Sequence, residues 1–231
     1  MVKKIHYIWL GGKKKSKSIK RCIKSWAKFF PDWEIIEWNE KNLNIHLMPY
    51  VEQAYREKKY AFASDVFRFD ILNKYGGLYF DVDVKVIKPF NDVFASCRAF
   101  SGFETDEYVA PGLVLYSGFP NNIAFQEMLN SYKNDNFILE DGSMNLLTVG
   151  QRFTKILDER GLIHDNTFQT IDGFAVFPKT YFNPMDYYGE LSNFSRDTHS
   201  IHLYAASWLP VTKRIRRKIS NTIHKIKKVI N

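Results

Sequence analysis

Apolar residues recur along the chain either in short runs or at helical spacing, and the two patterns predict strands and helices in turn. Residues 3–10 form an apolar run that predicts a buried first strand, stopped by Gly11-Gly12. Residues 16–29 carry apolar side chains every three or four positions, with Ser16 and Ser18 as candidate N-caps. The same criteria predict strands over 33–38, 78–84, 98–103, 113–116, 175–177 and 201–204, and helices over 47–59, 61–75, 121–132 and 145–160. Strands that alternate with helices indicate an α/β fold.

Composition fits one large α/β domain or two small ones. The chain has 231 residues, of which 45% are hydrophobic, as in an ordinary globular protein. The net charge is +8, and residues 211–231 hold eight Lys or Arg and no acid. Without that segment, 25 basic residues balance 25 acidic ones, so the basic excess belongs to the tail.

The tail has the pattern of a basic amphipathic helix. Its apolar residues recur every three or four positions, at Val211, Ile215, Ile219, Ile223, Ile226 and Ile230. We therefore predict a domain over 1–210 and a basic helix over 211–231. Such a helix either lies on an anionic membrane surface or packs on its own domain or a second chain.

The compartment is predicted from what the sequence lacks. Two cysteines, Cys22 and Cys97, make neither a disulfide framework nor a metal cluster. The first apolar run is too short for a signal-peptide core, and no apolar stretch reaches 18 residues. We expect a cytoplasmic protein, peripheral on the inner face of the cell membrane.

The strongest chemical signal is a pair of acids, Asp81 and Asp83, at the end of the apolar strand predicted over 78–84. Residues two apart on a strand share a face, unless the strand breaks between them. Two adjacent carboxylates repel each other, and a hard divalent cation relieves that repulsion and also binds a diphosphate. Taken alone, the same pair also fits a solvated strand end or turn.

Asp65 and Arg68 lie three positions apart on the preceding helix and can face the same way. The acid can accept bonds from sugar hydroxyls, and the arginine can hold a phosphate or sugar oxygen. The alternative is a helix-surface ion pair worth less than about 1 kcal/mol.

A family resemblance extends these motifs. The run Ala-Ser-Asp-x-x-Arg-x-x-x-Leu-x-x-x-Gly-Gly-x-Tyr-x-Asp-x-Asp, from Ala63 to Asp83, resembles the signature of the DXD-containing glycosyltransferases of family 32. That family includes capsule and lipopolysaccharide sugar transferases and yeast mannosyltransferases, and clostridial glucosylating toxins are more distant relatives. Residues 4–11, 175–184 and 202–208 resemble other family segments, so the resemblance covers most of 3–209.

The resemblance implies a GT-A fold, which has a mixed, mostly parallel sheet flanked by helices. It also implies Mn²⁺ or Mg²⁺ and a nucleotide-diphospho-sugar donor, with a UDP-hexose as our first expectation and GDP-mannose as the alternative. The activity would be a retaining transfer to a glycan or lipid-linked acceptor in surface polysaccharide synthesis. Retention proceeds either by front-side attack or through a covalent carboxylate intermediate.

Site roles follow from the same resemblance. Asp83 would bind the metal, Asp81 would contact the ribose or the metal through water, and Asp65 and Arg68 would hold the donor sugar. Tyr79 belongs to the same donor-binding motif.

The remaining implied roles belong to residues outside that motif. His202 or Ser207 would complete the metal and phosphate site, Trp208 would close over the diphosphate, and Trp9 would lie against the base. If the family resemblance is set aside, His202 and Trp9 are more simply interpreted as core residues. His6 lies on the opposite strand face from Trp9 and is predicted to be structural.

The sequence departs from the family in two places. Thr148-Val149-Gly150-Gln151 stands where Thr-Gly-Pro is frequent, and Leu203 follows His202 where a second histidine is frequent.

Two rival functions remain at this stage. A haloacid-dehalogenase-type phosphatase also uses an apolar strand before D-x-D, but Lys85 stands at its Thr or Val position, and no later acidic pair follows a strand. A non-catalytic basic module would bind a membrane or nucleic acid, but the bases are confined to one tail, and we expect no nucleic-acid partner.

Overall fold

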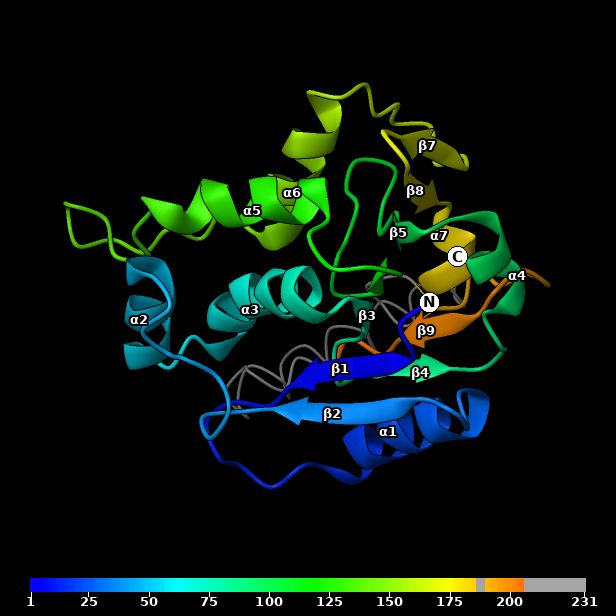
Figure 1. Cartoon of the computed structure of the whole chain (residues 1–231), viewed down its shortest axis with the longest axis horizontal. Helices are drawn as coiled ribbons and strands as arrows, with labels where there is room; N and C mark the ends of the chain where they lie inside the picture. The colour runs from blue at the N-terminus through cyan, green and yellow to red at the C-terminus, as the bar shows by residue number, and fades with distance from the viewer. Residues whose placement is uncertain (186–189, 206–231) are drawn as a thin grey trace, which may run out of the picture.

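A computed structural model of the chain describes residues 1–185 and 190–205 (Figure 1). Within these residues, seven strands form one sheet in the order β2-β1-β3-β6-β5-β8-β7, and β4 pairs with β9 in a small second sheet. The strands are β1 Lys4–Ile8, β2 Glu34–Trp38, β3 Gly77–Tyr79, β4 Val84–Val86, β5 Ala99–Gly102, β6 Leu115–Ser117, β7 Gln169–Ile171, β8 Phe174–Phe177 and β9 Ser200–His202. The helices are α1 Lys17–Phe29, α2 Pro49–Arg56, α3 Tyr60–Tyr75, α4 Asn91–Ser96, α5 Ile123–Lys133, α6 Val149–Asp158 and α7 Lys179–Phe182.

The large sheet is mixed, with most strands running one way. β1 pairs in parallel with β2 and β3, and β5 pairs in parallel with β8. β6 and β7 run antiparallel to their neighbours. The predicted α/β fold, with a mostly parallel sheet flanked by helices, is confirmed. Because β1 and β3 are parallel neighbours, their carboxyl ends meet at one edge of the sheet, which is where such folds place ligands.

An apolar core lies on each face of the sheet. Alternate residues of β1 divide between the cores, with Ile5 and Tyr7 packed toward α1 and Ile8 packed toward α2, α3, α5 and α6. Figure 1 shows α1 on one side of β1 and β2, and α3 with α2 and α5 on the other. His6 is fully buried, receives a hydrogen bond from the Trp38 indole at 3.1 Å, and lies 3.0 Å from the Gly76 carbonyl oxygen. His6 therefore has the structural role predicted for it.

Most long elements begin and end close to the predicted residues. Ser16 is the N-cap of α1, and its hydroxyl accepts a hydrogen bond from the Ile19 amide. Gly76-Gly77 ends α3, with φ angles of 63° and 100°. A Cβ at Gly77 would lie 2.7 Å from the Lys4 carbonyl oxygen, so this turn also requires the small residue for strand pairing.

One predicted strand, 78–84, is wrong in its extent. The chain leaves the sheet after Tyr79 and turns at Asp81–Val84, where the Val84 amide donates to the Asp81 carbonyl at 3.0 Å. Pairing partners differ on the two sides of the turn, since β3 pairs with β1 and β6 while β4 pairs with β9. Residues 78–84 look like one strand in the sequence because the strands on both sides of the turn carry buried apolar side chains.

Three short elements, α4, β7 and α7, were not predicted, because three to six residues carry too little periodicity to be recognised.

In the part of the chain that the structure describes, no helix has both the length and the apolar character that crossing a membrane requires. The helix predicted over 211–231 lies outside the described residues, and so does the domain boundary predicted near 210.

Trp26 is expected to be a main stabilising residue of the core that supports the turn after β3. It is fully buried, stacks on Phe80 with ring centroids 5.5 Å apart, and donates its indole N–H to the Val84 carbonyl at 2.8 Å. Trp26→Ala should lower the free energy of unfolding by about 3–5 kcal/mol in urea titrations. Phe119→Ala, at a side chain 42% exposed, should cost less than about 1 kcal/mol, and equal losses would contradict this assignment.

Candidate active site

A pocket of about 920 Å³ opens at the edge of the sheet where β1 and β3 end. Its walls come from the residues after β1, from α3, from the turn after β3, from segment 104–113, from the start of α6, and from β9 with the residues that follow it. Of the predicted site residues, the pocket brings together Trp9, Asp65, Arg68, Tyr79, Asp81, Asp83 and His202. Ser207 and Trp208 lie outside the described residues.

Arg68 organises the floor of the pocket. Its guanidinium is 3% exposed and donates to Asp65 at 2.6 Å, one helical turn back on α3. The same Nη2 atom lies 3.4 Å from Oδ1 of Asp81, and the guanidinium lies over the Tyr79 ring, 5.0 Å from its centroid. The Tyr79 hydroxyl donates to Asp81 at 2.8 Å. The ion pair of Asp65 with Arg68 is therefore a buried element of the site, and the alternative that it is a helix-surface ion pair is wrong.

Burial sets the protonation behaviour of this group. Loss of solvent raises the pKa of Asp65 to about 6, although the positive charge of Arg68 opposes the rise. For Arg68, burial favours the neutral form, but the charges of Asp81 and Asp65 dominate and raise its pKa. Arg68 is consequently a permanent cation at the floor of the pocket.

Asp83 and His202 form the second polar contact of the site. β9 pairs antiparallel with β4, and the register sets Val84 opposite His202. His202 Nε2 lies 3.1 Å from Asp83 Oδ1, and the Ala205 amide donates to Asp83 Oδ2 at 2.7 Å. Burial raises the pKa of a carboxyl, but His202 and these hydrogen bonds outweigh it, so the pKa of Asp83 is lowered. Burial likewise lowers the pKa of His202, and Asp83 reverses this and raises it to about 9.

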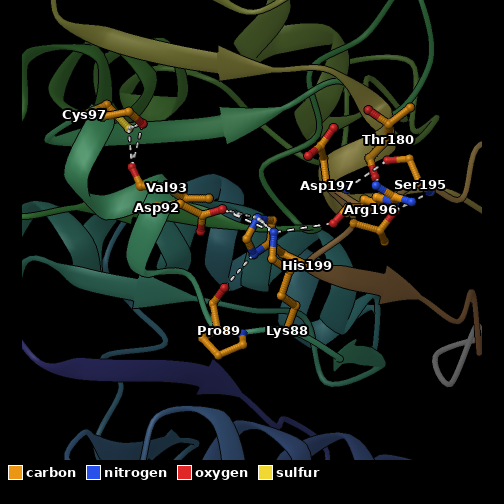
Figure 2. Close-up of polar contacts among 12 residues, drawn as sticks. Lys88, Pro89, Asp92, Val93, Cys97, Thr180, Ser195, Arg196, Asp197 and His199 are labelled. Atoms are coloured by element: carbon orange, nitrogen blue, oxygen red, sulfur yellow. Dashed lines mark hydrogen bonds and ion pairs between the residues drawn. The ribbon is translucent and has the colours of Figure 1, made fainter.

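A buried contact just before β9 fixes that strand against the rest of the fold (Figure 2). His199 is fully buried, its Nδ1 lies 2.7 Å from the Pro89 carbonyl oxygen, and its Nε2 lies 3.4 Å from Asp92. Its own carbonyl accepts hydrogen bonds from the Ile87 and Lys88 amides. His199 therefore anchors the start of β9, and the strand places His202 three residues later.

Trp9 follows β1 and lines the pocket. Its indole N–H donates to the Lys13 carbonyl at 2.6 Å, and the Lys15 ammonium lies 5.4 Å from the ring centroid. The ring is partly exposed and also packs against the core on the α1 side of the sheet. With its polar atom engaged, the ring offers the pocket an apolar surface.

Gly112 is a site residue that the sequence did not reveal. A Cβ at this position would overlap Oδ2 of Asp81 and would lie 2.9 Å from Nη1 of Arg68. The missing side chain leaves room for both charged groups. Gly112 belongs to the loop between β5 and β6, which carries no recognisable motif, so only the packing identifies it.

Glu104 and Tyr204 also line the pocket and were not predicted. The Tyr204 hydroxyl donates to Glu104 at 3.1 Å and accepts from the Asn183 amide at 2.6 Å. The His202 and Tyr204 rings are 4.3 Å apart, so this network continues to the Asp83–His202 contact. Glu104 lies 100 residues before Tyr204 in the chain, and no sequence pattern connects the two.

The described residues fit a metal ion that is shared with a substrate. No group of three His, Cys, Asp or Glu side chains among them is placed to hold an ion by itself. Asp81 and Asp83 supply two carboxylates to one pocket, and Mg²⁺ is usually held by one or two carboxylates with substrate phosphates and water. His202 Nδ1 is buried and has no hydrogen-bond partner among the described residues. The two carboxylates suit an ion completed by a diphosphate better than a structural metal.

Comparison with known proteins agrees with the motif. Residues 16–99 match the family described as "Glycosyltransferase sugar-binding region containing DXD motif". Toxin Afp18 of Yersinia ruckeri is 40% identical over 74 residues, which are 32% of this chain and 3% of the toxin. Subversion of eukaryotic traffic protein A of Legionella pneumophila is 27% identical, over 39% of this chain and 18% of that protein. The chain thus spans a small part of the length of both relatives.

Two solved structures are similar in arrangement. The PaToxG glycosyltransferase has a TM-score of 0.48 and 21% identity, with 68% of each chain covered. A glycosyltransferase involved in glycosylation of the major capsid of PBCV-1 has a TM-score of 0.46 and 10% identity, over 94% of this chain and 98% of that one.

The family match over residues 16–99 confirms the resemblance drawn from Ala63–Asp83. Residues 16–99, which match the DXD-containing sugar-binding family, supply Asp65, Arg68, Asp81 and Asp83 to the pocket.

Gly112→Ala should show how tightly the charged floor is packed. The added methyl group must displace Asp81 or Arg68, and we expect a loss of about 1–3 kcal/mol in the free energy of unfolding, measured with urea. Gly150→Ala is the matched control, since its Cβ would meet nothing closer than 3.5 Å. Unchanged stability of Gly112→Ala would mean that the floor has free space.

Proposed function

We propose that this protein is a metal-dependent, retaining glycosyltransferase that moves a hexose from a nucleoside diphosphate sugar, in the first instance a UDP-sugar. The observation that carries the proposal is the convergence of Asp65, Arg68, Asp81 and Asp83 on one pocket within the DXD-containing region. The fold brings in His202 from a strand more than 100 residues later in the sequence.

The acidic and basic residues of the pocket have different proposed roles. Asp83 and Asp81 would hold Mn²⁺ or Mg²⁺, which when bound neutralises charge on the leaving diphosphate. Asp65, a buried carboxylate, would accept hydrogen bonds from sugar hydroxyls. Arg68 keeps Asp65 in place and supplies a fixed positive charge beside Asp81.

The groups that come from β9 and beyond complete this arrangement. His202, which contacts Asp83, or Ser207 would complete the metal and phosphate site, and Trp208 would close over the diphosphate. Trp9 would stack on the base. Retention follows either by front-side attack of the acceptor hydroxyl or through a carboxylate intermediate.

The acceptor is proposed to be a glycan or a lipid-linked sugar, as in surface polysaccharide synthesis. The basic residues of 211–231 would hold the enzyme on the inner face of the cell membrane, near such an acceptor. The phosphatase alternative gains no support, because Lys85, at its Thr or Val position, is an exposed residue on β4.

Donor binding should raise the melting temperature in a metal-dependent way. Thermal-shift screening of UDP- and GDP-sugars with and without Mn²⁺ should give a shift of several degrees for one nucleotide only when Mn²⁺ is present. Asp83→Ala should abolish that shift, because it removes the proposed metal ligand. Asp32→Asn, at an exposed turn, should retain it. A shift of equal size in Asp83→Ala would overturn the assignment.

Trp9→Ala should weaken nucleotide binding without removing its dependence on metal. Loss of ring stacking on a base costs about 1–3 kcal/mol, which corresponds to roughly 5- to 150-fold in Kd. Calorimetric titration of UDP in the presence of Mn²⁺ measures this change. Trp9→Phe keeps a stacking ring and should recover most of the affinity. Wild-type affinity in Trp9→Ala would show that the base lies elsewhere.

A further inference from the structure

The solvent face of α1 carries a strong and one-sided positive charge. Residues 1–31 contain ten Lys or Arg and no Asp or Glu. Five of these bases lie on α1, and all five are exposed: Lys17, Lys20, Arg21, Lys24 and Lys28. At about 100° per residue, these positions fall within roughly 100° of helix circumference and extend about 16 Å along the axis.

The opposite face of α1 is the one that holds the helix to the domain. Ile19, Cys22 and Trp26 are buried there. The basic stripe, defined here as the five exposed bases of α1, is therefore held in a fixed position by a packed core. The backbone positions of its five bases are therefore fixed relative to one another.

The basic stripe has no acidic partner within the described part of the chain. None of its five residues forms an ion pair there, whereas Lys15, Lys74 and Lys88 each pair with an acid. The segment 206–231 contains no acid either, so its charge cannot neutralise the stripe. An external anionic surface is the complementary partner.

The stripe continues toward the pocket. Lys13 and Lys14 are exposed in the loop that leads into α1, and Lys13 lines the pocket. A surface that contacts the stripe therefore comes close to the pocket mouth. Lys85, exposed on β4 next to α1, adds a further base beside it.

The chemistry of the stripe favours lipid headgroups over nucleic acid. Four of its five bases are lysines, which act as point charges, and no exposed aromatic ring lies between them to stack on bases. Lysines near an anionic bilayer each contribute on the order of 1 kcal/mol. With the apolar residues of α1 turned inward, the contact is electrostatic and does not require insertion.

We propose that the basic stripe of α1 is a docking surface for an anionic lipid bilayer. The proposal does not rest on the transferase activity, since the surface binds headgroups whether or not a donor occupies the pocket. It adds a second, structured contact to whatever the basic segment 211–231 contributes, and two such signals together give firmer membrane attachment than one.

The test compares two triple variants of the full chain in vesicle sedimentation. Lys17→Gln/Lys20→Gln/Lys24→Gln removes three charges from the stripe, and Lys41→Gln/Lys133→Gln/Lys155→Gln removes three exposed charges elsewhere. On vesicles with 30% phosphatidylserine, the stripe variant should partition on the order of 10- to 100-fold more weakly, and the control should behave as wild type. Binding should also fall steeply with added salt and be absent on pure phosphatidylcholine.

Other results would overturn the proposal. These are wild-type partition of the stripe variant, an equal loss in the control variant, and equal binding to uncharged vesicles. Loss of binding to a single-stranded RNA by the stripe variant, without vesicle binding by the wild type, would assign the stripe to nucleic acid. The thermal shift with donor and Mn²⁺ should be the same in both variants, so failure of this proposal is distinguishable from failure of the proposed activity.

Discussion

The buried contact between Arg68 and its two carboxylates is the constraint on which the rest of the site depends. A guanidinium that is 3% exposed requires compensating charge, and Asp65 and Asp81 supply it from a helix and from the turn after a strand. This contact fixes how the middle of α3 and the turn after β3 lie relative to each other. It also keeps polar groups at the floor of a pocket whose surroundings are largely apolar, where a sugar nucleotide needs specific partners.

The space around this contact is made by glycines and by strand pairing. Gly112 leaves room for Asp81 and Arg68, and Gly77 lets β3 approach β1 closely. On the other side of the turn, the pairing of β4 with β9 delivers His202 to Asp83. The two acids of the motif thus have different surroundings: Asp81 contacts Arg68 and Tyr79, and Asp83 contacts His202 and a backbone amide. Different surroundings suit different roles toward metal and donor.

The helix α1 serves the core with one face and carries the charged stripe on the other. Trp26 supports the turn after β3 through its bond to the Val84 carbonyl, so the same helix stabilises the site and presents bases to solvent. A membrane contact at the stripe would therefore act on a rigid part of the domain.

The sequence by itself determined the helix over 61–75, the glycine turn and the acidic pair, because helical periodicity, glycine conformation and motif spacing are local properties. It also placed Asp65 and Arg68 on one helix face, one turn apart. Only the tertiary structure decided that the chain turns at Asp81 instead of continuing as a strand, since that depends on which strands pair with each half. The same holds for Gly112, Glu104 and Tyr204, whose places in the pocket arise from contacts between segments far apart in the chain, and such contacts leave no periodic trace in the order of residues.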